Sequence, residues 1–391
     1  MRNLPRAKLN GSRWKARRAA MQSCTKIMSC RQIPVAIWIS WSANQARKSR
    51  ARVTDVIELG DIEFIGSGLK RPECVLAHSS GLMIVPDWTG AGGVSLVAPH
   101  GGSIRHLAAD RAETDPLRPN GIALENGGTI LLAHLGDEAG GLFRLHPDGT
   151  TETVLDKVDG KTLPPSNFVI SDGGGGLFLT VSTRRVPRAL GYRTDVDDGF
   201  IVHIPYRGKP RIAADGLGYT NECMLHPSGR WLYVNETFVR RLSRFKVTGR
   251  GKLGKRETVC EFGAGIFPDG LAVDIDGNAW VTSIVSNCLV SVSAEGEQMI
   301  WLEDFDPDHL AWVEEAYQAN EMGRPHLDDV RSQCLRNISN LAFGGADLKT
   351  AYLGCLLGDS IASFQMPVAG HPLQHWQADI EPLLQAKGLA Q

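Results

Sequence analysis

The sequence has 391 residues and a net charge of −1, and its 43 glycines and 20 prolines are typical of a turn-rich all-β protein. Because 42% of the residues are hydrophobic, the chain can form a core, so the composition excludes a wholly disordered protein. No apolar run reaches ~18 residues, so we expect no transmembrane helix and no membrane partner.

The charge is unevenly distributed along the chain. Residues 1–52 carry thirteen Lys and Arg residues and no acidic residue, and the first carboxylate is Asp55. The remaining residues carry 29 basic and 43 acidic side chains, a net charge of −14. An acidic protein is a poor partner for nucleic acid and a good one for cations, so we expect a small-molecule substrate and no nucleic-acid partner. Nothing in the sequence indicates an oligomeric state.

The basic N-terminal segment is expected to lie outside the fold. We predict a disordered extension over residues 1–54 and one folded domain over residues 55–391. An Arg-rich segment without acidic residues could be a transit peptide. The favoured alternative is an unstructured segment that precedes a later translation start, for example at Met21 or Met28.

The eight cysteines have neither CxxC nor zinc-finger spacing. Most lie within predicted strands, where a free cysteine behaves as a small buried hydrophobic residue. This pattern favours a reducing compartment, and we expect a cytoplasmic protein.

A pattern of two short strands joined by a polar turn recurs along the chain. Its clearest copy is FPDGLAVDIDGNAWV at residues 267–281, in which Asp276 and Gly277 form the turn. One polar residue stands near the start of the first strand of each copy, at spacings of 47, 47, 54, 48 and 71 residues. These six residues, called the mouth residues below, are Glu73, Asn120, Asn167, Asn221, Asp269 and Asn340. A period near fifty residues with about four short strands per unit predicts a six-bladed β-propeller.

The blades are predicted in chain order. Blade one is expected over residues 61–107, with its first strand at 62–65, and the next three blades over 120–155, 167–214 and 221–261. Blade three contains an inserted loop at 184–198. Blade five begins at Asp269, and the segment near 57–59 is expected to close the ring against blade six.

One helical insertion is predicted between blades five and six, at about residues 307–330. Leu310, Val313, Ala316 and Tyr317 form an amphipathic stripe, and Pro325 is expected to end or kink the helix. The insertion either caps one face of the propeller or packs on its outside, and long insertions are often functional lids.

The mouth residues should meet at one end of the central channel, because the innermost strands of all blades run in the same direction. The second strand of each blade is antiparallel to the first, so it brings Trp88, His134 and Glu236 to the same rim. Buried carboxylate and amide oxygens are costly unless a cation or water satisfies them, and they are the ligands of a hard divalent ion. The alternative is that these Asn and Asp residues only cap turns.

These motifs resemble those of the senescence-marker-protein/regucalcin/gluconolactonase family over about residues 61–377. The resemblance rests on PDG at residues 268–270, FGG at residues 343–345 and the spaced asparagines. It implies one divalent cation (calcium, zinc, magnesium or manganese, with calcium favoured) held by Glu73, Asn221 and Asp269. Asn167 matches a family residue that approaches the metal or the substrate.

The sequence also departs from the family pattern. Cys74 follows Glu73 where the family usually has glycine, and Phe168 follows Asn167 where it usually has aspartate. Pro164, Pro165 and Ser166 occupy a place where members acting on sugar lactones often carry arginine. The stretch at residues 233–245 resembles strictosidine-synthase-like relatives. These departures leave the substrate open.

The resemblance and the ring chemistry together predict a metal-dependent hydrolase, most simply a lactonase of the gluconolactonase type. The ion would polarise the ester carbonyl, and Asp269 is the candidate general base. A carboxylate that also binds the ion is a weak base, so hydroxide bound to the ion is the alternative proton acceptor. Asn120 and Asn167 are expected to orient the substrate, with contacts from Trp88, His134 and Glu236. A solvated loop histidine is an equal alternative for His134.

Other functions remain open at this stage. No GxSxG motif and no convincing Ser/His/Asp order is present, so a metal-free hydrolase is not expected. The propeller could instead be a binding platform whose channel is pinned by a metal. It could also hydrolyse other esters, including organophosphates.

Overall fold

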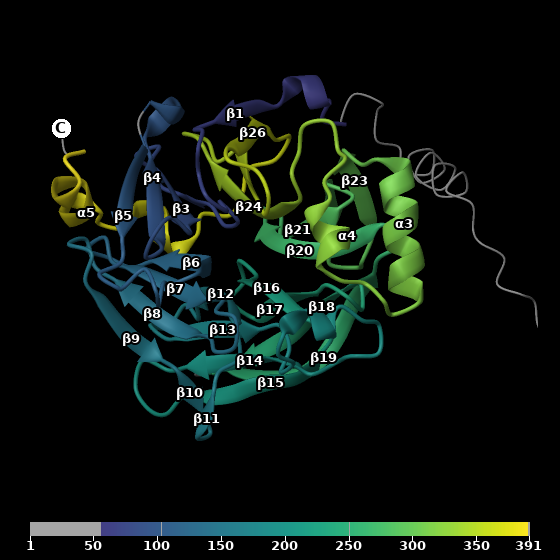
Figure 1. Cartoon of the computed structure of the whole chain (residues 1–391), viewed down its shortest axis with the longest axis horizontal. Helices are drawn as coiled ribbons and strands as arrows, with labels where there is room; N and C mark the ends of the chain where they lie inside the picture. The colour runs from purple at the N-terminus through teal and green to yellow at the C-terminus, as the bar shows by residue number, and fades with distance from the viewer. Residues whose placement is uncertain (1–55, 103, 250, 390–391) are drawn as a thin grey trace, which may run out of the picture. The chain divides into compact units, whose positions relative to one another are not determined.

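A computed structural model describes residues 56–389 except Ser103 and Arg250. Its strands form six four-stranded antiparallel sheets, arranged as the blades of a β-propeller (Figure 1). This confirms the predicted all-β, six-bladed fold. The extension predicted over residues 1–54 lies outside the described residues. No helix of the described ranges is both long and apolar enough to cross a bilayer.

The first three blades follow the chain in order. Blade one consists of β2 (Leu76–Ala77), β3 (Met83–Asp87), β4 (Gly93–Val97) and β5 (Ile104–Ala108). Blade two consists of β6 (Pro119–Leu124), β7 (Ile130–His134), β8 (Gly141–Leu145) and β9 (Thr151–Leu155). Blade three consists of β12 (Ser166–Ser171), β13 (Leu177–Val181), β14 (Gly199–Ile204) and β15 (Arg211–Leu217). A small hairpin, β10 (Lys157–Val158) and β11 (Lys161–Thr162), separates blades two and three.

The other three blades complete the ring. Blade four consists of β16 (Thr220–Leu225), β17 (Trp231–Glu236), β18 (Arg241–Thr248) and β19 (Lys252–Glu261). Blade five consists of β20 (Ile266–Val273), β21 (Ala279–Val285), β22 (Cys288–Val292) and β23 (Gln298–Leu302). Blade six consists of β24 (Ile338–Gly344), β25 (Thr350–Cys355), β26 (Ile361–Gln365) and β1 (Glu63–Ile65).

Short helical segments occupy several connections. The 3-10 turns are η1 (Leu59–Asp61), η2 (Pro99–Gly101), η3 (Arg188–Gly191) and η4 (Gln374–Gln377). The α-helices are α3 (Pro307–Gln318), α4 (Arg324–Asp328) and α5 (Glu381–Ala386).

The inner strands approach each other closely around the channel. All eight residues of β20 are buried, and its PDG motif includes Gly270. A Cβ atom at Gly270 would lie 2.5 Å from the Cα atom of Asn340 in β24, a distance at which something must shift. Glycine after the mouth residue is therefore required by strand-to-strand contact.

The ring is closed by β1, which pairs with β26 in blade six. The prediction placed this strand in blade one and expected residues 57–59 to close the ring, and both assignments were wrong. Blade one already has four strands without residues 63–65, so β1 completes a blade that otherwise has three. Ile57 instead donates its backbone N–H to the carbonyl oxygen of Trp301 in blade five at 2.8 Å.

We expect the ring closure to contribute measurably to stability. Removal of residues 1–66 deletes β1 and exposes the edge of β26, so the thermal midpoint should fall by about 5 °C or more. Removal of residues 1–55 is the matched control and should leave the midpoint unchanged. Thermal unfolding followed by circular dichroism measures both. Equal midpoints for the two truncations would show that β1 does not hold the ring.

The insertion between blades five and six packs on the mouth end of the propeller. Asp306 caps α3 by accepting a hydrogen bond from the backbone N–H of His309 at 2.7 Å. The buried face of α3 packs against Phe267 and neighbouring aromatic residues. The Tyr317 hydroxyl donates to the carbonyl oxygen of Phe238 at 2.9 Å. The structure therefore favours a cap over packing on the outside.

The predicted single helix is two helices. The first ends at Gln318, and Pro325 lies at the start of α4, where its missing N–H costs nothing. Pro325 therefore begins a helix and does not end one. The loop inserted in blade three joins this cap, because the backbone N–H of Thr194 donates to the side-chain oxygen of Asn320 at 2.8 Å.

Candidate metal centre and active site

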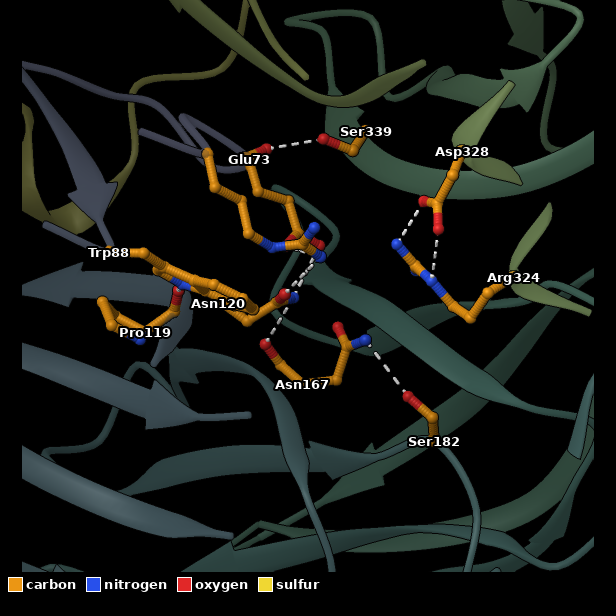
Figure 2. Close-up of polar contacts among 10 residues, drawn as sticks. Glu73, Trp88, Pro119, Asn120, Asn167, Ser182, Arg324, Asp328 and Ser339 are labelled. Atoms are coloured by element: carbon orange, nitrogen blue, oxygen red, sulfur yellow. Dashed lines mark hydrogen bonds and ion pairs between the residues drawn. The ribbon is translucent and has the colours of Figure 1, made fainter. Parts of the chain in front are cut away.

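Three mouth residues from neighbouring blades contact each other directly. The Asn120 amide donates to Oε1 of Glu73 at 2.6 Å and lies 3.2 Å from the backbone carbonyl oxygen of Asn167. Figure 2 shows these side chains converging from blades one, two and three. All three residues are buried. The inner strands of blades one to three therefore bring oxygen-bearing side chains together at the mouth of the channel.

Asn221 and Asp269 belong to the same group. The Asn221 side chain lies near enough to Asp269 to lower the pKa of its carboxyl, whereas the negative charge of Glu73 raises it. Burial, reinforced by Glu73, raises the pKa of Asp269 well above its ordinary value. Two buried carboxylates therefore lie near enough for their charges to interact, an arrangement that favours a bound cation.

The strongest sign of a ligand is a set of buried oxygens without partners. Oδ1 of Asn167, of Asn221 and of Asp269 is buried and accepts no hydrogen bond from the described residues. Their amide nitrogens are fixed, because Asn167 donates to Ser182 Oγ at 3.1 Å and Asn221 to Thr237 Oγ1 at 3.0 Å. The amide oxygens are thus left over for another group.

These oxygens fit a hard divalent cation. Two carboxylates and two amide oxygens are the donor types that such ions bind. Within the described ranges, no cluster of three or more His, Cys, Asp or Glu residues could hold a metal. That finding agrees with a site in which amides supply half of the donors. The assignment of Glu73, Asn167, Asn221 and Asp269 as ligands stays a prediction.

Glu73 already has protein partners at both oxygens. Its Oε2 atom pairs with the Arg71 guanidinium at 3.0 Å, while Asn120 occupies Oε1. Arg71 lies over the Trp88 ring at 4.6 Å and has a left-handed backbone with φ of 62°. This conformation is strained for arginine and directs the side chain into the mouth. Arg71 was not predicted from the sequence, because the stretch RPEC at residues 71–74 contains no motif typical of a site residue.

Trp88 and His134 lie at the rim. The Trp88 indole N–H donates to the carbonyl oxygen of Pro119 at 2.7 Å (Figure 2), and this bond fixes the ring over which the Arg71 guanidinium lies. His134 Nδ1 accepts the backbone N–H of Arg118 at 2.9 Å, and its ring meets Phe143 edge-on. Both side chains thus hold neighbouring strands together, and their contact with a substrate stays a prediction.

Glu236 is held entirely by its own blade. Its side chain has no exposure, and its oxygens accept from Arg241, Ser243 and the backbone N–H of Gly218. Although burial opposes ionisation, Arg241 and the Gly218 N–H lower the pKa of Glu236. The structure does not bring this carboxylate into the group around Asp269.

Asn340 and Glu222 form a second polar pair within the channel. Asn340 Oδ1 accepts the backbone N–H of Val75 at 2.9 Å, and its amide donates to Glu222 at 2.8 Å. The other oxygen of Glu222 accepts the backbone N–H of Leu271 at 2.7 Å. Burial raises the pKa of Glu222 well above its ordinary value. Its signal in the sequence, an acidic residue within a predicted strand directly after Asn221, was overlooked.

The fold and the mouth define a six-bladed β-propeller with a buried ring of carboxylate and amide oxygens at one end. Residues 167–302 match the family model described as the SMP-30/gluconolactonase/LRE-like region. The match confirms the resemblance and contains Asn167, Asn221 and Asp269. No curated protein matches the chain significantly in sequence.

Solved structures of similar fold carry related names. A gluconolactonase from Xanthomonas campestris is 18% identical, with a TM-score of 0.58, over 82% of this chain and 94% of that one. A calcium-binding regucalcin from Agrobacterium tumefaciens strain C58 is 16% identical, with a TM-score of 0.53, over 80% of this chain and 98% of that one. A luciferin-regenerating enzyme is 13% identical, with a TM-score of 0.55, over 81% of this chain and 99% of that one. At these identities the likeness establishes the fold.

His134 should make stability depend on pH. Burial, with the charge of Arg111, lowers its pKa from 6.5 to about 4. Between these values the unfolded chain binds a proton that the folded chain does not, so the free energy of unfolding falls as pH falls through this window. We expect a contribution on the order of 2 kcal/mol, measured by urea denaturation at about pH 7.5 and about pH 4.5.

The variant His134→Gln should show a smaller fall than the unchanged protein. His146→Gln is the matched control, because His146 lies on the half-exposed outer part of the same blade. If His134→Gln loses as much stability on acidification as the unchanged protein, then other groups take up the proton.

Proposed function

We propose that this protein is a metal-dependent hydrolase that opens a lactone, with a sugar lactone or a related lactone as substrate. The observation that carries the proposal is the set of three unpartnered buried oxygens beside Glu73 at the mouth of the channel. The family match over residues 167–302 and the gluconolactonase of similar fold support it. Calcium is the favoured ion, in line with a fold relative described as calcium-binding.

In this proposal the residues at the mouth have different roles. Glu73, Asn167, Asn221 and Asp269 hold the cation, which when bound supplies Lewis-acid polarisation of the ester carbonyl and lowers the pKa of water. Asp269 is the candidate acceptor of the proton of the attacking water, and hydroxide that a bound ion would supply is the alternative acceptor. Asn120 and Asn167 are the candidates for orienting the substrate, and the contacts of Asn120 with Glu73 and with the Asn167 carbonyl oxygen support this role.

Substrate recognition involves the rim and the cap. We assign Trp88 and His134 as candidate contacts and keep Glu236 as the weakest candidate, since its carboxylate is fully engaged within its blade. We also propose a cytoplasmic location, because the six cysteines of the described residues are all free thiols.

The test is a panel of lactones, carboxylic esters and an organophosphate ester, assayed with chelator-treated protein and with added calcium, zinc, magnesium or manganese. Metal should restore lactone hydrolysis. The variant Asp269→Asn should lower kcat/KM by about 100-fold or more, because it removes a metal-binding carboxylate and the candidate base. Asp276→Asn, an exposed change in the turn of the same blade, is the matched control and should leave kcat/KM unchanged.

A second measurement separates catalysis from binding. Calcium at about 100 times its Kd should stabilise the protein by about 3 kcal/mol, and Asp269→Asn should lose this thermal shift while keeping its circular dichroism spectrum. A thermal shift without turnover of any ester would favour the metal-pinned binding platform. Hydrolysis that persists after chelation would contradict the metal dependence.

A further inference from the structure

Three arginines from separate segments surround the mouth. Arg71 precedes β2, Arg188 begins η3 in the loop inserted in blade three, and Arg324 begins α4 in the cap. Arg188 and Arg324 are both near enough to act electrostatically on Arg71. Figure 2 shows the Arg324 side chain reaching from α4 toward the region of Asn167 and Glu73. The two insertions thus add positive charge over a ring built by the repeats.

Arg188 has no partner of its own. It makes no hydrogen bond or ion pair with the residues that the structure describes, although it is only partly exposed. It lies near enough to Tyr219, Tyr192, Glu73 and Asp269 for their charges to act on it. A half-buried guanidinium whose five donors have no protein acceptor among the described residues is available to bind an anionic ligand.

The positive charge is felt by a neighbouring phenol. Burial disfavours the Tyr192 phenolate, but Arg188 and Arg324 outweigh burial and lower the pKa of Tyr192. Tyr192 and Tyr219 meet edge-on at 5.4 Å and form a buried aromatic wall with Phe238. A ligand at Arg188 and Arg324 would therefore lie beside an apolar wall that weakens competition from water.

The charges at the mouth do not balance without an anion. The carboxylates of Glu73 and Asp269 would be neutralised by one divalent cation. Among the described residues, the three arginines then have only Asp328 as a further acidic partner, which pairs with Arg324. The excess is positive, and guanidinium groups match the planar oxygens of carboxylate and phosphate.

We propose that the mouth selects lactones that carry an anionic group, a carboxylate or a phosphate, bound by Arg188 and Arg324 beside the Tyr192 wall. The inference rests on the proposed lactone hydrolysis at the same mouth and defines its substrate class. The anionic group binds on the side of the two insertions, while the ester carbonyl faces Asp269 and the ring oxygens.

The experiment compares three lactones of one sugar series under identical metal conditions: neutral glucono-lactone, its 6-phosphate and the carboxylate-bearing glucaro-lactone. We expect kcat/KM to be at least about 10-fold higher for one or both charged lactones, through KM more than kcat. The better of the two identifies the anion. The preference should weaken as salt concentration rises, since it is electrostatic.

The variant Arg188→Gln should lower the ratio of charged to neutral kcat/KM by about 10-fold or more, and Arg188→Lys should restore part of it. Arg324→Gln should lower the same ratio and serves as the second variant if Arg188→Gln folds poorly. Arg185→Gln is the matched control, because Arg185 lies on the same loop but pairs with Asp198 at 3.4 Å. Its ratio should not change.

The outcomes separate the two proposals. Equal hydrolysis of charged and neutral lactones, or an unchanged ratio in Arg188→Gln and Arg324→Gln, would overturn the anion selectivity and leave the lactonase intact. If no lactone is hydrolysed, calorimetry with inorganic phosphate and with glucarate measures whether the mouth binds an anion at all. Binding that Arg188→Gln abolishes and Arg185→Gln keeps would support the anion site while the lactonase proposal fails. The absence of such binding would overturn both.

Discussion

Six inner strands surround one axis in this propeller, and the polar residues at their starts must share a small buried space. Each buried oxygen there needs a donor or a cation, because an unsatisfied polar atom away from water is costly. The protein satisfies both oxygens of Glu73 internally, through Arg71 and Asn120. Ser182 and Thr237 satisfy only the amide nitrogens of Asn167 and Asn221. The oxygens of Asn167, Asn221 and Asp269 are left, and they set the chemistry that the mouth can support.

The repeat is what made the fold predictable from the sequence. The spacing of Asn120, Asn167, Asn221 and Asp269 fixed the number of blades and the end at which these side chains meet, because period and strand direction are properties of the chain itself. The closing strand was misplaced for a physical reason. Residues 57–59 and 62–65 are both short and apolar, and only the pairing with β26, far away in the sequence, decides between them.

The arginines of the mouth could not be predicted in the same way. Arg188 and Arg324 lie on insertions that follow no repeat, so their positions depend on how loop and cap pack against Tyr219 and Phe238. Arg71 depends on one left-handed backbone angle. The proposed metal ligands thus belong to the repeated part of the chain, whereas the arginines proposed to select the substrate belong to its irregular parts. Relatives with the same ring and other insertions would be expected to differ in substrate.

The composition of blade six also bears on how the protein is made. Its inner three strands come from the end of the chain, and its outermost strand, β1, comes from the beginning. During synthesis β1 emerges first and has no partner until β26 leaves the ribosome, after every other blade strand. Nascent chains would therefore carry an open ring and a free strand edge for most of translation, a state prone to pairing with other chains. Blade six can therefore close only after all the other blade strands have been synthesised.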